Sequence, residues 1–115
     1  MQLVAMERGS LPPTQRVPFF AHVDEFQTFS SEAFASLLSE ARKFATHFCL
    51  ANQYADQLSP AARSAVIGNA GTLIVFLVGR RNAELLAPEL RPMDPAGLAD
   101  QEPHTAWLRV SAATV

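Results

Sequence analysis

The stretch VPFFAHVDEFQTF, residues 17–29, contains the pattern that decides the fold. Its apolar run ends abruptly in two adjacent carboxylates, Asp24 and Glu25, and then resumes. Residues 17–23 are apolar on both faces of a strand except for His22, which is typical of a parallel strand covered on both sides. We therefore predict a buried strand that carries two acids to one edge of a sheet.

Bulk composition narrows the class of protein. A chain of 115 residues corresponds to one domain, and a hydrophobic fraction of 49% suffices for a small core. The net charge of −2 argues against a strongly basic nucleic-acid-binding surface on this chain. The single cysteine, Cys49, excludes an internal disulfide and suits a reducing compartment. No apolar run reaches the roughly 18 residues of a membrane span, and the N-terminus lacks a signal-peptide pattern, so we predict a cytoplasmic location.

Helices and strands alternate along the rest of the chain. Ser30 and Ser31 can cap a helix whose apolar side chains recur at helical spacing. Ser59 and Pro60 are typical of a second helix start, and Asn82 is expected to cap a third helix. The expected elements are, in order, a helix to about residue 44, a strand over 46–52, a helix over 60–67, a strand over 71–78, a helix over 82–90, a single turn over 95–98 and a strand over 105–110.

This order predicts an α/β fold, a three-layer, mainly parallel sheet with helices on both faces. Residues 1–16 are predicted to be an irregular N-terminal segment, formed by the end of an upstream helix and a loop. Residues 17–110 are predicted to be most of an α/β domain or the second half of a larger one, and residues 111–115 are predicted to be a tail. His47 and Cys49 alternate on one strand but make no recognised metal spacing, so we expect them to pack in the core.

Polar residues follow three of the predicted strands, at Asp24-Glu25, Asn52-Gln53 and Arg80-Arg81. Ligands of parallel sheets bind beyond the carboxyl ends of the strands. If these three strands are parallel neighbours, the acids, the amide and the guanidinium groups share one rim and suit a metal-bound phosphate. The alternative is that a buried strand simply leaves the sheet into solvent at its two acids.

Three segments in order resemble a known family: VPFFAHVDEFQTF, LLSEARKFATHFCLANQY and GNAGTLIVFLVGRRNAELLAPEL. Together they are similar to the C-terminal half of the RecA-like motor ATPases of DNA conjugation. These are the TraG/TraD-type coupling proteins of type IV secretion, with the HerA and FtsK translocases as more distant relatives. The resemblance covers residues 17–90 and fades beyond them.

The resemblance implies a role for four residues. The stretch up to Glu25 would be a Walker B strand, with Asp24 on Mg²⁺ through water and Glu25 orienting and activating the attacking water. Gln53 would be the polar sensor of the γ-phosphate. Arg42 would act as an arginine finger on the ATP of a neighbouring subunit in a hexameric ring. The implied partners are DNA, ATP with Mg²⁺, and components of a secretion system, with a possible tie of the parent protein to the inner membrane.

The phosphate-binding loop of such motors, GxxxxGK(S/T), does not occur in the chain. We therefore expect these residues alone not to hydrolyse ATP, and we expect the loop to lie upstream of Met1. Three interpretations stay open. The chain is the Walker B and sensor part of a DNA-translocating motor, or a truncated, inactive RecA-like remnant that serves at most in assembly or interaction. The third is an unrelated small α/β regulatory domain that binds Mg²⁺ alone through its acids.

Overall fold

The computed structural model describes residues 7–29 and 31–111. Residues 1–6 of the helix end predicted over residues 1–8, the capping residue Ser30 and residues 112–115 of the predicted tail lie outside this part, whereas residues 7–9 are helical. Within it the elements are η1 (Pro13–Gln15), β1 (Phe19–Val23), η2 (Phe26–Phe29), α2 (Glu32–Glu40), η3 (Ala41–Phe44), β2 (Thr46–Leu50), η4 (Ala55–Gln57), α3 (Pro60–Asn69), β3 (Thr72–Phe76), α4 (Arg80–Leu86), η5 (Ala87–Glu89), α5 (Pro95–Ala99) and β4 (Ala106–Val110).

Two of the predicted helix starts are confirmed by their capping bonds. The Ser31 hydroxyl accepts a hydrogen bond from the N–H of Phe34 (3.3 Å) at the start of α2. The Ser59 hydroxyl accepts one from the N–H of Ala62 (3.1 Å), and Pro60 occupies the first turn of α3. These local signals were sufficient because the donor and acceptor are three residues apart.

The prediction for Asn82 is wrong. Helix α4 begins at Arg80 after Gly79, so Asn82 lies inside the first turn and does not cap it. Its side chain is buried and accepts a hydrogen bond from the backbone of another element, because a buried amide has to find a partner wherever one lies. The α-helix ends at Leu86, and Pro88 follows in η5, since proline lacks the N–H that a continuing helix requires.

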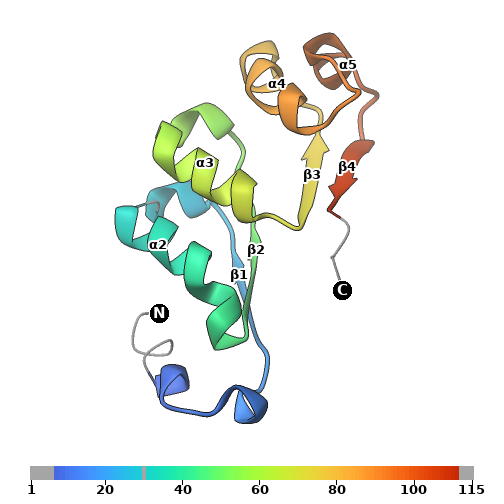
Figure 1. Cartoon of the computed structure of the whole chain (residues 1–115). Helices are drawn as coiled ribbons and strands as arrows, with labels where there is room; N and C mark the ends of the chain where they lie inside the picture. Colours follow the sequence, from blue (N-terminus) through green and yellow to red (C-terminus); the bar gives the residue numbers. More distant parts are fainter. Residues whose placement is uncertain (1–6, 30, 112–115) are drawn as a thin grey trace.

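The strands form two separate pairs (Figure 1). β1 and β2 are parallel, with register partners from Phe19↔Thr46 to Val23↔Leu50. β3 and β4 are antiparallel, with partners from Thr72↔Val110 to Phe76↔Ala106. The α/β class is confirmed, with helices alternating with strands and a parallel pair at its start. The expected pairing of β3 beside β1 and β2 does not occur among the residues that the structure describes, because β3 takes β4 as its partner.

Helices α2 and α3 lie side by side over one face of the β1–β2 pair (Figure 1). A buried cluster joins them to the strands; its members are Phe26, Phe34 and Leu58, with Val23, Leu38, Leu50 and Val66 packed against it. Phe34 also meets Phe48 of β2 edge to face at 6.1 Å between ring centroids. This face of the strand pair is therefore the inner one.

The opposite face of the β1–β2 pair is exposed, which corrects two predictions. The structure exposes His47 and Cys49, which were expected in the core, and His22. Phe20 is 65% exposed and stacks on His47. The apolar pattern of residues 17–23 predicted cover on both sides, but every helix packed on this pair lies on the side of Phe48, since alternate residues of a strand point to opposite faces.

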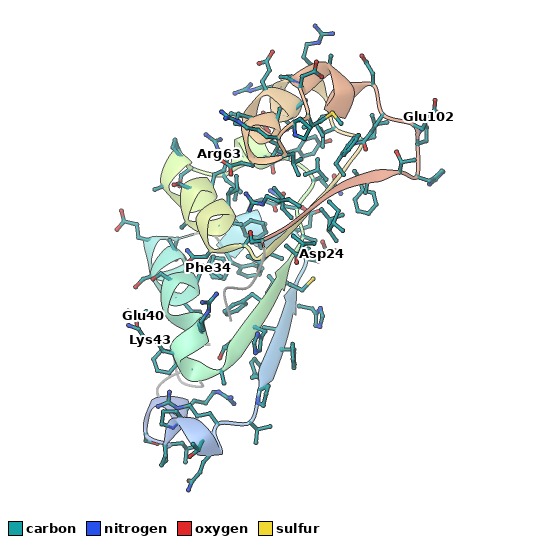
Figure 2. The ribbon with its side chains drawn as sticks, turned by 45° about the vertical axis from the view of Figure 1, so that its right-hand side comes forward. Asp24, Phe34, Glu40, Lys43, Arg63 and Glu102 are labelled. Carbon is teal, nitrogen blue, oxygen red and sulfur yellow. The ribbon has the colours of Figure 1, made fainter. Side chains whose placement is uncertain are left out.

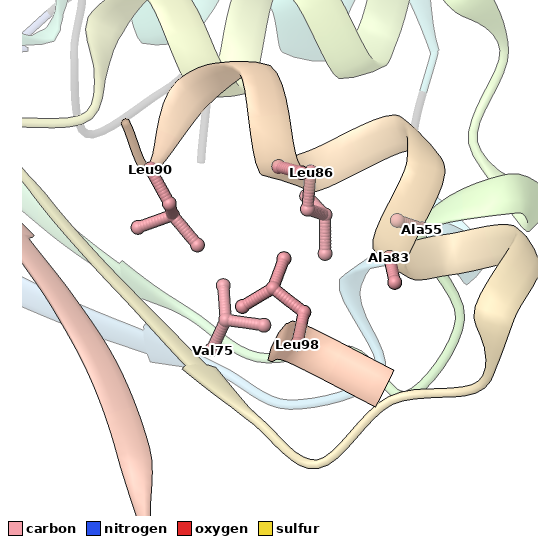
Figure 3. Packing of buried hydrophobic residues seen from close by; sticks show 7 residues of the cluster. Ala55, Val75, Ala83, Leu86, Leu90 and Leu98 are labelled. Atoms are coloured by element: carbon pink, nitrogen blue, oxygen red, sulfur yellow. The ribbon is translucent and has the colours of Figure 1, made fainter. Parts of the chain in front are cut away.

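A second cluster lies between the β3–β4 pair and helices α4 and α5. Its buried members are Ala55, Val75, Ala83, Leu86, Ala87, Leu90 and Leu98 (Figure 3). The outer face of this pair is apolar and open, with exposed side chains from both strands: Ile74, Phe76, Leu108 and Val110. Each strand pair therefore has helices on one face and an open surface on the other, which is apolar for β3–β4 and mixed for β1–β2.

The molecule is long for its chain length, with principal extents of 48 × 31 × 22 Å. Its radius of gyration is 15.6 Å, whereas a compact chain of this length has a radius of about 13 Å. The two core clusters follow one another along the long axis. This arrangement leaves the outer sheet faces without cover.

Candidate functional site

The carboxyl ends of β1 and β2 are joined by hydrogen bonds around Ala51. Its N–H donates to the carbonyl oxygen of Val23 (2.9 Å), and its own carbonyl oxygen accepts from the N–H of Phe26 (3.2 Å). The two residues between these partners, Asp24 and Glu25, therefore bulge from the sheet beside the segment that leaves β2. Phe26 is only 3% exposed and fixes the end of this bulge in the core.

The bulge orients both carboxylates. One oxygen of Asp24 accepts a hydrogen bond from the N–H of Glu25 (2.9 Å), while the side chain remains exposed. Glu25 is half-buried, and its Oε2 accepts from the side-chain amide of Gln27. Its backbone has a φ of 49°, a left-handed conformation that costs about 1–2 kcal/mol for a residue other than glycine. Such strain is concentrated at functional sites.

Asn52 and Gln53 follow Ala51 directly, so the structure brings Gln53 to the same end of the sheet as the two acids. This is the juxtaposition that the sequence predicted for the first two strands. Gln53 is exposed, and the neighbouring Asn52 donates its amide N–H to the carbonyl oxygen of Tyr54 (3.1 Å). The bend after β2 is thereby closed on itself, and the Gln53 side chain stands at its outside.

The residues at this rim fit a hydrated Mg²⁺ ion better than a metal held by protein alone. Among residues 7–29 and 31–111, no three His, Cys, Asp or Glu side chains are grouped so that they can hold a metal ion. Mg²⁺ commonly keeps several waters and takes one or two carboxylates together with substrate phosphates. Asp24, as an exposed and oriented carboxylate, is suited to that water-mediated role.

Arg42 lies at the opposite end of the same strands. It belongs to η3, which leads into the amino end of β2, whereas Asp24 follows the carboxyl end of β1. Figure 2 shows Asp24 and Lys43, the neighbour of Arg42, at the two ends of the strand pair. At about 3.3 Å per residue, the strands separate these ends by roughly 16 Å. The exposed Arg42 guanidinium therefore does not reach the acids of its own chain.

Two arginines of the N-terminal segment hold the turn that carries Arg42. The Nε of Arg8 donates to the carbonyl oxygen of Phe44 (2.9 Å), and Nη1 of Arg16 donates to that of Lys43. The Arg42 side chain itself has no hydrogen bond or ion pair within the part of the chain that the structure describes. The predicted irregular segment thus has a structural task that local patterns did not reveal, because its partners lie 27 and 36 residues away.

The arginines after β3 are placed differently from the prediction. Since β3 does not pair with β2, Arg80 and Arg81 do not reach the rim through neighbouring strands. Arg81 instead forms an ion pair with Asp56 of η4, with 3.2 Å between Nε and Oδ2. Beside it, the N–H of Asp56 donates to Oδ1 of Asn82 (3.0 Å). Helix α4 is therefore connected to the segment that follows Gln53.

Arg109 of β4 links the two strand pairs. Its Nη2 donates to the carbonyl oxygens of Ile67 and Ala70 at the end of α3, each at 3.3 Å. Its Nη1 forms an ion pair with Glu89 of η5 at 3.1 Å. Sequence reasoning assigned no role to this residue, because nothing in the local pattern indicates partners at such sequence separations.

No family model and no curated protein matches the sequence. Among the solved structures that match is a bacterial conjugative coupling protein, TrwBdeltaN70, in an unbound monoclinic form. The TM-score is 0.78 at 16% sequence identity, over 96% of this chain and 33% of that chain. The likeness is one of fold. The chain has the RecA-like α/β fold of that coupling protein and spans one third of its length.

Residues 7–29 and 31–111 contain the helices α2 to α5. None of the helices that they form is long and apolar enough to cross a membrane.

Proposed function

We propose that this chain is the Walker B and sensor part of an ATP-driven, DNA-translocating motor of conjugation or type IV secretion. The observation that carries the proposal is the bulge of Asp24 and Glu25, bonded on both sides to Ala51 and so held beside Gln53. It is supported by the fold likeness to a conjugative coupling protein. The proposed location is the cytoplasm, with homo-oligomeric rings acting on DNA.

The rim residues have separate tasks in this proposal. Asp24 would hold Mg²⁺ through a water, and the ion would supply charge neutralisation on the phosphates of ATP. Glu25, half-buried and hydrogen-bonded by Gln27, orients the attacking water and accepts its proton. Gln53 donates its side-chain amide N–H to the γ-phosphate and so distinguishes ATP from ADP.

Arg42 acts on a neighbouring subunit. Arg42 cannot reach the rim of its own chain, because it lies at the far end of the strands. Its side chain is exposed on a turn that Arg8 and Arg16 hold in place. In a ring, the amino end of the strands in one subunit faces the rim of the next. The guanidinium then stabilises charge that develops in the transition state of phosphoryl transfer.

The test uses the full-length natural protein that carries this chain, assayed for ATP hydrolysis with Mg²⁺ and DNA. Glu25→Gln should lower kcat by about 10²–10⁴-fold, the usual contribution of a general base, while nucleotide binding is retained. Glu102→Gln, an exposed acid far from the rim (Figure 2), is the matched control and should leave kcat unchanged. Normal hydrolysis by Glu25→Gln would disprove the Walker B assignment.

The same assay tests Arg42. Arg42→Ala should lose ATP hydrolysis only under conditions in which rings assemble. Ring assembly is measured by light scattering on the same samples. An equal loss in a monomeric form would assign Arg42 a role within its own chain.

A second candidate is a RecA-like module that no longer hydrolyses ATP and serves in assembly or interaction. One observation favours it: the outer face of the β3–β4 pair is apolar and open. Absence of hydrolysis by the wild-type full-length protein, with and without DNA, would favour this candidate over the motor.

A further inference from the structure

The bend that carries Gln53 is anchored at both ends. On one side, Ala51 is bonded to Val23 and Phe26 of the β1 segment. On the other side, the N–H of Asp56 donates to Oδ1 of Asn82 in α4 (3.0 Å). Residues 52–55 lie between these anchors, and four residues leave the backbone little freedom to shift.

The two anchors belong to different parts of the molecule. Ala51 continues the β1–β2 pair, whereas η4 packs into the cluster beneath β3 and β4. Figure 3 shows Ala55 of η4 next to Ala83 of α4 within that cluster. The position of Gln53 therefore depends on how α4 holds η4.

Asn82 is the chemically unusual member of this contact. Its side chain is polar, yet the residue is only 7% exposed. The next residue, Ala83, is fully buried. A buried amide is unfavourable unless it is hydrogen-bonded, so an apolar residue would suit simple packing equally well. What an apolar residue cannot do is accept the N–H of Asp56 and so select one position of η4 on α4. The exposed ion pair between Arg81 and Asp56 adds to the same contact.

We propose that Asn82 is a positioning residue for Gln53. By holding Asp56 it sets the far end of the bend and keeps Gln53 at the rim beyond the carboxyl ends of β1 and β2. The inference rests on the proposed function, because it assigns Asn82 a task in the ATP site of that motor. Asn82 itself touches neither substrate nor metal.

Hydrolysis kinetics of the full-length natural protein test the inference. Asn82→Ala should lower kcat by about 10- to 100-fold, as a displacement near 1 Å does, with little change in KM. In a Gln53→Ala background the same substitution should lower kcat no further, because the residue through which it acts is gone. Asn69→Ala, which removes an exposed asparagine bonded only within α3, is the matched control and should have no effect.

A measurement on the wild-type 115-residue chain requires no variant. The amide of Asp56 should exchange with deuterium clearly more slowly than that of the exposed Gln53. Equal rates would show that the anchor does not form and would overturn the inference. An undiminished effect of Asn82→Ala in the Gln53→Ala background would overturn it as well. Normal hydrolysis by Glu25→Gln, in contrast, would refute the motor and leave the exchange result in place.

Discussion

The two strand pairs are built from similar apolar segments and yet differ in what their ends can do. β1 and β2 are parallel, so the residues that follow both strands, Asp24 and Gln53 among them, meet at one rim. β3 and β4 are antiparallel, so the carboxyl end of β3 lies beside the amino end of β4. Polar residues after β3 consequently have no partner strand that ends next to them. Strand direction, rather than the apolar run itself, therefore makes the end of a sheet a candidate site.

Each strand pair buries only one of its two faces, so the chain exposes more surface than a compact fold does. The accessible surface of the chain is 8058 Å², whereas a folded chain of this mass exposes roughly 6,200 Å². Arg109 of β4, through its hydrogen bonds to the end of α3, is a polar link between the two halves. Three experiments test whether the two halves unfold as one unit and how their backbones and outer faces differ.

The largest effects are expected in the two cores. Phe34→Ala beneath β1–β2 and Leu98→Ala beneath β3–β4 should lower the free energy of unfolding by about 3–5 and 2–5 kcal/mol, because each leaves a cavity. Urea unfolding is followed by far-UV circular dichroism and by fluorescence of Trp107, the single tryptophan, on β4. If the halves form one cooperative unit, both probes report one transition for each variant. Separate transitions would show that the halves unfold independently, and Val17→Ala, at a position 74% exposed, is the control.

A smaller effect is expected where the backbone of the β1–β2 half is strained. Glu25 and Ala45 have φ values of 49° and 51°. Replacement of either by glycine relieves the left-handed strain, and the added unfolded-state entropy offsets part of it, so each should stabilise by about 0.5–1 kcal/mol. Only Glu25→Gly should also abolish hydrolysis in the full-length protein. Thermal unfolding measures the change in stability, and the hydrolysis assay measures the loss of activity. Destabilisation by Glu25→Gly would show that the side-chain contacts of Glu25 outweigh the backbone strain.

The smallest effect on stability is expected on the outer faces. Leu108→Glu on β4 and Phe20→Glu on β1 change side chains that are 58% and 65% exposed. Each should alter the free energy of unfolding by less than about 1 kcal/mol but raise the solubility of the chain, since open apolar patches favour association. Solubility after concentration and the sedimentation profile measure this. A large loss of stability in either variant would show that its outer face is packed in solution.

The sequence predicted those features that depend on neighbours along the chain. The order of helices and strands, the caps at Ser31 and Ser59 and the acids at the end of the first strand are of this kind, because their interactions span a few residues. Burial was harder to predict. His47 and Cys49 were expected in the core, but whether a strand is covered on its second face depends on elements that the strand itself does not specify.

The sequence by itself therefore determined the α/β class and put Asp24, Glu25 and Gln53 at strand ends. Only the tertiary structure decided that β1 and β2 are parallel neighbours, that β3 turns to β4, and that Arg42 lies at the far end of the strands. It also decided that Asn82 holds Asp56 instead of capping a helix. The reason is the same in each case: these arrangements rest on hydrogen bonds and contacts between segments far apart in the chain, and no local pattern encodes the partner.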